Sequence, residues 1–246
     1  MSGRKAVFNW SGGKDSALAL HKIILAGEPH VSCLLTTVNE HFDRVSMHGV
    51  RTELLERQAE LIGIPLVQVK LPEMPDMLTY EKLMMEHLVK LTRDGIRTAV
   101  FGDIFLDDLR KYREDALSRI GMTCLFPIWK IPTKRLIEEF IELGFKAITV
   151  CVDEKYLDKS FAGKTIDRSF IDSLPPNVDP CGENGEYHSF VYDGPIFKEP
   201  IRFRKGEIVH RKYSRTQSES GGESGPSDPF DTGFWYCDLI PVQDTY

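Results

Sequence analysis

Apolar residues in the first half of the chain alternate between short continuous runs and longer stretches in which they recur every three or four positions. The continuous runs predict strands at residues 6–8, 31–38, 66–71, 98–102 and 123–126. The periodic stretches predict helices at residues 17–25, 51–62, 79–92 and 106–120. Strands that alternate with helices of this length form parallel β-α-β units. We therefore predict an α/β fold with a doubly wound parallel sheet.

The pattern changes after residue 127. A helix is predicted at residues 133–143, and two short helices within residues 156–174 are separated at Gly163. Further strands are predicted at residues 147–152, 187–192, 201–203, 208–213 and 234–240. We place a domain boundary near residue 128, so that residues 1–128 form the first domain and residues 129–246 a smaller α+β domain. Residues 214–228 contain no apolar side chain and predict a flexible loop.

Composition and charge narrow the class of protein. The 246 residues are 41% apolar and 28% charged, as in water-soluble globular proteins. No stretch approaches the roughly 18 apolar residues of a membrane span, and the apolar run after the basic N-terminus is too short for a signal peptide. We therefore expect a cytoplasmic protein without membrane contact. The five cysteines include no C-x-x-C pair, which predicts reduced thiols, and the net charge of -6 argues against a nucleic-acid partner.

A glycine-rich stretch, Trp10-Ser11-Gly12-Gly13-Lys14-Asp15-Ser16, joins the first predicted strand to the first helix. Two glycines let the backbone approach an anion, and the free N–H groups of the following helix turn point toward it. The serine hydroxyls and the lysine add donors and a positive charge. A glycine turn with a capping Asp15 or Ser16 is the alternative, but such a turn does not require a lysine and two serines. The stretch therefore predicts a phosphate site.

The spacing of this stretch differs from that of the Walker A loop. If Gly13 and Lys14 ended a Walker A loop, its first glycine would fall at Phe8 and its hydroxyl at Asp15. The sequence S-G-G-K-D-S after a first strand instead resembles the PP-loop of the ATP pyrophosphatases. Those enzymes split ATP between the α and β phosphates and adenylate a substrate. The resemblance implies that ATP binds at Ser11, Gly12, Gly13, Lys14, Asp15 and Ser16.

Ligands of doubly wound sheets bind beyond the carboxyl ends of the strands, which selects the loops at residues 9–15, 36–50 and 102–108. We take Thr37, His48 and Gly102 in these loops as further candidate ATP contacts. In addition, Arg51 opens a helix whose N-terminus can hold an anion.

The third of these loops is followed by a charged helix. Asp103 directly follows a buried strand, where a carboxylate is costly unless it holds a metal, a ribose or a cation, so Asp15 and Asp103 are the candidate magnesium ligands. Arg110, Arg113 and Glu114 share one face of the predicted helix. That face is either an exposed surface with salt bridges or a substrate contact through the two arginines.

A second polar motif lies at residues 180–190, P-C-G-E-N-G-E-Y-H-S-F, ahead of a predicted strand. Glu186 and His188 fall two residues apart and so on the same face of that strand, where the pair could bind a polar substrate or relay a proton. A polar turn without chemistry is the alternative. The candidate substrate contacts of the motif are Gly182, Glu183, Asn184, Gly185 and Glu186.

Three motifs together resemble the diphthine ammonia ligase family: S-G-G-K-D-S, G-D-I-x-x-x-D-x-R-x-x-R-E at residues 102–114 and G-E-N-G-E-Y-H-S-F-V-Y-D-G-P-I-F at residues 182–197. The resemblance covers roughly residues 5–213. It implies a PP-loop (HUP-like) domain of the adenine nucleotide hydrolase type that uses ATP and magnesium. The implied reaction adenylates a carboxylate and transfers the acyl group to ammonia, with Lys14, Asp15, Glu186 and His188 as catalytic residues.

Some features differ from those associated with the eukaryotic ligases, namely the sequences H-G-V-R at residues 48–51 and F-G-D-I-F-L at residues 101–106, and the lack of long C-terminal domains. We therefore expect a compact branch, such as a prokaryotic one, whose acceptor carboxylate lies on a protein or a small molecule. A PP-loop enzyme that modifies tRNA and a module that binds ATP without turnover are the alternatives. The absence of paired cysteines argues against the former, and the polar cluster at residues 183–188 argues against the latter. The sequence is compatible with both a monomer and a homo-oligomer.

Overall fold

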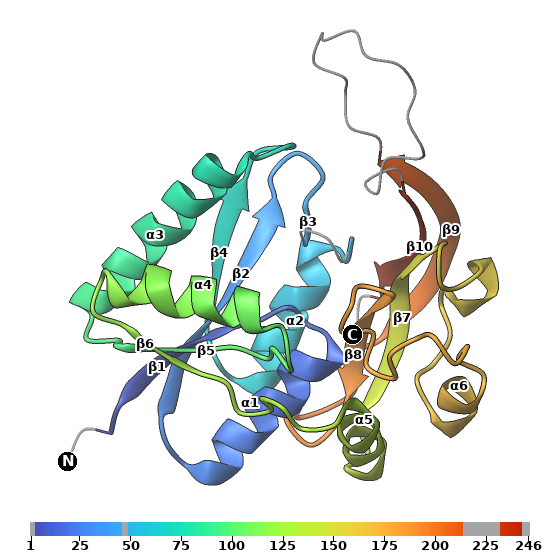
Figure 1. Cartoon of the computed structure of the whole chain (residues 1–246), viewed down its shortest axis with the longest axis horizontal. Helices are drawn as coiled ribbons and strands as arrows, with labels where there is room; N and C mark the ends of the chain where they lie inside the picture. Colours follow the sequence, from blue (N-terminus) through green and yellow to red (C-terminus); the bar gives the residue numbers. More distant parts are fainter. Residues whose placement is uncertain (1–2, 46–48, 214–231, 243–246) are drawn as a thin grey trace, which may run out of the picture.

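The computed structural model describes residues 3–45, 49–213 and 232–242 (Figure 1). His48 and the loop predicted at residues 214–228 lie outside these ranges. Two sheets lie side by side, the first built from the N-terminal half of the chain and the second from the C-terminal half. None of the helices within the described ranges is both long and apolar enough to cross a membrane.

The first sheet contains five parallel strands in the order β4-β2-β1-β5-β6. The chain adds strands on one side of β1 and then on the other, so the strand order reverses between β1 and β5. The prediction of a doubly wound parallel sheet is therefore confirmed, and ligands are expected where the carboxyl ends of β1 and β5 meet. The strand bounds are β1 Lys5–Asn9, β2 His30–Asn39, β4 Leu66–Leu71, β5 Thr98–Val100 and β6 Thr123–Leu125.

Helices cover both faces of this sheet, as the alternation of buried side chains along β1 requires. Phe8 belongs to the core cluster that contains Leu18 and Leu54, from the helices of one face, whereas Val7 packs with Leu88 and Leu117, from the helices of the other. The helices of the first face are α1 Lys14–Ala26 and α2 Thr52–Ile62, and those of the second are α3 Met77–Arg93 and α4 Asp107–Ser118.

The second sheet is antiparallel, in the order β8-β7-β10-β9. The hydrophobic cluster that contains Phe8 continues into this sheet through Phe190 and Val191, so the two halves of the chain share one core. The domain boundary near residue 128 stays a prediction. The elements of this half are α5 Thr133–Glu142, β7 Lys146–Asp153, the 3-10 helix η1 Lys159–Phe161, α6 Arg168–Asp172, β8 Tyr187–Asp193, β9 Phe203–Tyr213 and β10 Thr232–Pro241.

Two elements differ from the sequence prediction. A two-residue strand, β3 Arg44–Val45, pairs antiparallel with the end of β2 inside the segment predicted as a loop, and it is too short to leave a periodic signal. The strands predicted at residues 201–203 and 208–213 form one strand, β9, because the intervening charged residues belong to an exposed edge strand. The two short helices separated at Gly163 are confirmed. The five cysteines are free thiols, as predicted.

Candidate active site

The glycine loop between β1 and α1 is closely packed, and Gly12 occupies a left-handed conformation that favours glycine. Gly12 has a φ of +77°, and a Cβ there would lie 2.7 Å from Gln58 Oε1. A Cβ at Gly13 would lie 3.2 Å from the carbonyl oxygen of Ser189. The N–H groups of Gly13 and Lys14 donate to the hydroxyl oxygens of Ser11, at 3.3 Å, and Ser189, at 3.1 Å. Both amides thus open α1 and point at oxygen atoms, as a phosphate site requires.

Gln58 fixes this loop to the second sheet. It is fully buried, and its side chain accepts from Trp10 Nε1 at 2.9 Å and donates to the carbonyl oxygens of Gly12 at 3.0 Å and Val191 at 2.6 Å. The N–H of Val191 also donates to the Gly12 carbonyl at 2.9 Å. Sequence reasoning assigned Gln58 no role, although a glutamine among the apolar positions Leu54 and Leu61 of a helix is the signal that could have found it.

Lys14 lies in the first turn of α1 and is 3% exposed. Its Nζ pairs with Asp15 Oδ2 at 2.7 Å and donates to the carbonyl oxygen of Cys181, and it lies 5.0 Å from the centre of the Tyr187 ring. Burial alone would lower the pKa of Lys14, but the Asp15 carboxylate, together with Tyr187 and Cys181, outweighs it and the pKa is raised. The ammonium group therefore remains charged and is held in one place.

The loop before β8 is folded around Glu186, which is 1% exposed. The Glu186 carboxylate accepts from the N–H of Asp179 at 2.9 Å, the N–H of Asn184 at 3.0 Å and Asn184 Nδ2 at 3.0 Å. Gly182 and Gly185 occupy positive φ values in the same loop. Glu186 thus uses its carboxylate to close a turn, and this turn carries Glu183.

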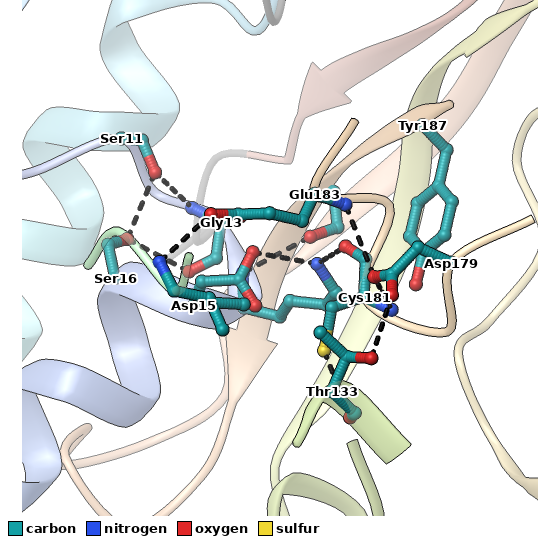
Figure 2. Close-up of polar contacts among 12 residues, drawn as sticks. Ser11, Gly13, Asp15, Ser16, Thr133, Asp179, Cys181, Glu183 and Tyr187 are labelled. Carbon is teal, nitrogen blue, oxygen red and sulfur yellow. Dashed lines mark hydrogen bonds and ion pairs between the residues drawn. The ribbon is translucent and has the colours of Figure 1, made fainter. Parts of the chain in front are cut away.

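Glu183 joins this turn to the loop after β5. Its Oε1 accepts from the N–H groups of Ile104, at 2.8 Å, and Phe105, at 3.4 Å. Burial, and to a lesser degree the charge of Asp15, raise the pKa of Glu183 to about 7, and the Ile104 N–H opposes this shift. Figure 2 shows the Glu183 side chain reaching toward the loop of Gly13, while Thr133 and Cys181 contact each other below it in this view.

These groups surround a cavity of about 130 Å³. Pockets that enclose a whole drug-sized ligand are about 300–1,000 Å³, so this cavity suits the phosphate end of a nucleotide rather than all of it. Its lining comes from the loop before α1 and from the segment that leads into β8. The lining residues are Ser11, Gly13, Lys14, Asp15, Gly182, Glu183, Gly185, Tyr187, His188 and Ser189.

Two family models match the chain. The diphthamide synthase N-terminal domain matches residues 4–124, and the diphthamide synthase C-terminal domain matches residues 132–218. The chain belongs to the diphthamide synthase family. The family resemblance inferred from the three motifs is thus confirmed. Both of the motifs that form the cavity, at residues 11–16 and 182–189, lie within the matched segments.

Curated relatives of the chain are named diphthine–ammonia ligase. The proteins of Schizosaccharomyces pombe, human and Danio rerio are each 26% identical to the chain and match 81% of it. The chain spans 36% of the S. pombe protein but 82% of the human and 86% of the D. rerio protein. The chain therefore covers most of the length of the human and D. rerio relatives, and its place in a compact, prokaryotic branch stays a prediction. The relatives support an enzyme that forms a carbon–nitrogen bond.

Several predicted site residues lie outside the cavity lining. Gly102 packs against the start of α1, since a Cβ there would lie 3.0 Å from the N atom of Ser16. Thr37 lies near the carboxyl end of β2 and pairs with Val69 of β4. Asn184 and Glu186 do not line the cavity and instead hydrogen-bond to each other within the turn before β8. Gly12 and Ser16 lie behind it, with Ser16 Oγ donating to the Gly13 carbonyl at 2.9 Å.

Asp103 is neutralised by a neighbouring arginine. Arg113 Nε lies 2.8 Å from Asp103 Oδ2, and the guanidinium lies 4.3 Å from the centre of the Phe101 ring. Burial raises the pKa of Asp103, although Arg113 opposes this shift. Arg113 also lines a second cavity, of about 250 Å³, between α3 and α4. Within the ranges that the structure describes, no group of three or more potential metal ligands is present.

The other candidate arginines also have partners within the chain. Arg110 pairs with Glu114 at 2.8 Å, one helical turn away, and stacks 4.8 Å from the Trp129 ring, which confirms the shared face of the charged helix. Arg51 makes two hydrogen bonds to the carboxylate of Asp238 in β10, at 2.7 and 3.1 Å. The anion that the Arg51 side chain binds is thus a side chain of the chain itself.

Proposed function

We propose that the chain is an ATP-dependent amide ligase that adenylates a carboxylate and transfers the acyl group to ammonia. The observation that carries this proposal is the single cavity formed by the phosphate loop and by the second family motif. Lys14 contacts Cys181 through its ammonium group and Ser189 through its backbone N–H, so the two motifs are in direct contact. A module that only held ATP would not need a second motif against its phosphates.

The first half-reaction uses the positive charge around the loop. The acceptor carboxylate attacks the α-phosphorus of ATP, and pyrophosphate leaves with the bonding electrons. Lys14 and the N–H groups that open α1 stabilise the charge that develops on the leaving group. Here the hydroxyls of Ser11 and Ser189 satisfy the N–H groups of Gly13 and Lys14, and bound phosphate oxygens would take their place.

Magnesium fits this site through Asp15, whose carboxylate lines the cavity beside Lys14. Mg²⁺ takes one or two carboxylates and fills its remaining positions with phosphate oxygens and water, so it does not require a cluster of three protein ligands. Bound magnesium would neutralise part of the pyrophosphate charge. Asp103 is the second candidate ligand, but its carboxylate would first have to leave Arg113.

The names of the relatives suggest the acceptor. We propose the carboxylate of a diphthine residue on a protein, with ammonia as the nucleophile. The second family motif provides Glu183 and His188 on the side of the cavity opposite the loop, where an acceptor and ammonia would meet the α-phosphate. Glu186 would act indirectly, by holding the turn that carries Glu183.

Exchange of labelled pyrophosphate into ATP tests this proposal, because reversible adenylation returns the label to ATP. We expect exchange that depends on a diphthine-bearing protein and is lost in Lys14→Ala. Lys90→Ala, which changes an exposed lysine of α3, is the matched control and should keep the wild-type rate. Exchange that proceeds equally without the acceptor, or that survives Lys14→Ala, would contradict the proposal.

A further inference from the structure

At neutral pH ammonia is present mostly as ammonium, which has no lone pair. Amide formation therefore requires that a proton first be removed from the nitrogen. A general base must therefore lie in the cavity where the acyl adenylate forms. The following inference rests on the proposed function and concerns which side chain takes this proton.

Most carboxylates near the cavity already have partners. Asp15 pairs with Lys14 Nζ at 2.7 Å. Glu186 lies outside the lining and binds three N–H groups. Asp179 accepts from the hydroxyl of Thr133 at 2.7 Å and from the N–H of Cys181 at 2.8 Å, and it too lies outside the lining. These three carboxylates are therefore already paired within the chain.

Glu183 differs from them because only one of its oxygens is used. Oε1 is anchored by the N–H groups of Ile104 and Phe105. Within the described part of the chain, Oε2 makes no hydrogen bond, and the side chain lines the cavity (Figure 2). Anchoring one oxygen fixes the position of the other, so Glu183 presents an oriented acceptor to the cavity that holds Lys14.

We propose that Glu183 binds ammonium through Oε2 and takes one of its protons, so that ammonia can attack the acyl adenylate. The nitrogen forms a bond to the acyl carbon while the bond from that carbon to the AMP oxygen breaks, and its electron pair leaves with AMP. Glu183 ends as the neutral acid, and the second proton lost by nitrogen passes to water. Atoms and charges balance without a further reactant.

The charged surroundings suit this role. Asp15 and Lys14 face Glu183 from α1, His188 and Tyr187 from β8, and Asp179 and Cys181 from its own loop. As a result, the pKa of the Glu183 carboxyl is about 7, close to neutral pH, so the group can both accept and release a proton. An acid with an ordinary pKa would be a weaker base toward ammonium.

The variant Glu183→Gln tests the proposal, because a glutamine keeps an oxygen for Ile104 N but cannot accept a proton. Wild type and variant are compared with two nucleophiles, ammonium chloride and hydroxylamine, on a diphthine-bearing protein with ATP. Hydroxylamine is largely uncharged at neutral pH and needs no such base. We expect amide formation to fall at least about 100-fold in the variant. Hydroxamate formation and pyrophosphate exchange should stay within about threefold of wild type.

Glu138→Gln, an exposed position on α5, is the matched control and should leave both products unchanged. If Glu183→Gln reduced amide and hydroxamate equally, Glu183 would act in adenylation or in loop position and the proposal would be overturned. Unchanged amide formation would overturn it as well. If the wild type itself made neither product and exchanged no pyrophosphate, the proposed function would be wrong, so the two failures can be told apart.

Discussion

Three charged side chains, Lys14, Asp15 and Glu183, give the cavity its chemistry, and each was identified from sequence motifs. The motifs could not tell which of the polar residues around them face the ligand. The second motif favoured Glu186 as the catalytic carboxylate and Glu183 as a substrate contact, yet Glu183 lines the cavity and Glu186 is buried in a turn. The difference arises from φ values at Gly182 and Gly185, which a residue pattern does not specify.

At this scale, magnesium should depend on Asp15 more than on Asp103. Asp15→Asn should remove the magnesium-dependent gain in ATP affinity, about tenfold or more, because its carboxylate lines the cavity. Asp103→Asn should change that gain less than about threefold, since its charge is used by Arg113. Calorimetric titration of ATP with and without magnesium measures both. If Asp103→Asn lost more of the magnesium-dependent gain in ATP affinity than Asp15→Asn, the metal would be bound by the loop after β5.

The raised pKa of Glu183 predicts a pH-dependent stability. A carboxyl whose pKa rises from its ordinary 4.5 to about 7 on folding destabilises the fold as pH rises through that window, and not below it. Glu183→Gln removes this cost. The variant should therefore match the wild type near about pH 5 and exceed its unfolding free energy by about 2 kcal/mol near about pH 8, after allowance for partial solvent exposure. Urea unfolding of both proteins at the two pH values measures this difference. A difference in unfolding free energy that is the same at both pH values would show that the pKa of Glu183 is ordinary.

At the scale of elements, periodicity predicted the helices and parallel strands because each buries one continuous apolar face. Elements without such a face were missed or divided. β3 spans two residues, and the middle of β9 carries exposed charges. The position of β8 against the loop before α1 could not be predicted either, because it depends on hydrogen bonds between residues far apart in the sequence, such as those of Gln58.

Gln58 should control how β8 holds the phosphate loop. Gln58→Leu removes the partners of Trp10 Nε1 and of the Gly12 and Val191 carbonyls, although Val191 N still donates to Gly12. We expect a loss of about 2–3 kcal/mol in unfolding free energy. We also expect a KM for ATP raised at least tenfold with a smaller change in kcat. Gln68→Leu, on the exposed side of β4, should change neither parameter. An unaltered KM for ATP in Gln58→Leu would mean that the phosphate loop keeps its geometry without the hydrogen bonds of Gln58.

At the scale of the whole molecule, the two sheets are joined by a shared core and by an ion-pair cluster. Asp238 of β10 contacts Arg51, at the start of α2, and Arg44 of β3, at 2.7 and 3.0 Å. No sequence signal links residues so far apart, and Arg51 alone suggested a site for a bound anion. The cavity is lined by residues from both halves of the chain, so its shape depends on how these contacts hold the two sheets together.

This cluster should stabilise the molecule only while Asp238 is ionised. Burial would raise the pKa of Asp238, but the two arginines outweigh it and the pKa is lowered. The stabilisation is therefore present above the ordinary pKa of 3.8 and is lost as pH falls below it. Asp238→Asn should cost about 1–2 kcal/mol near neutral pH, since the arginines are partly exposed and screened. That cost should shrink toward about pH 2. A constant difference across the range would exclude the ion pairs as its source.

The central claim is that the acceptor carboxylate is adenylated in the cavity formed by the phosphate loop and the second family motif. Diphthine-bearing acceptor whose carboxylate is enriched in oxygen-18 tests this claim most directly. With ATP and ammonium, mass spectrometry of the nucleotide product should find one heavy oxygen in AMP for each amide formed, because the carboxylate oxygen leaves with the α-phosphate. AMP without heavy oxygen, or heavy oxygen in inorganic phosphate instead, would contradict the account.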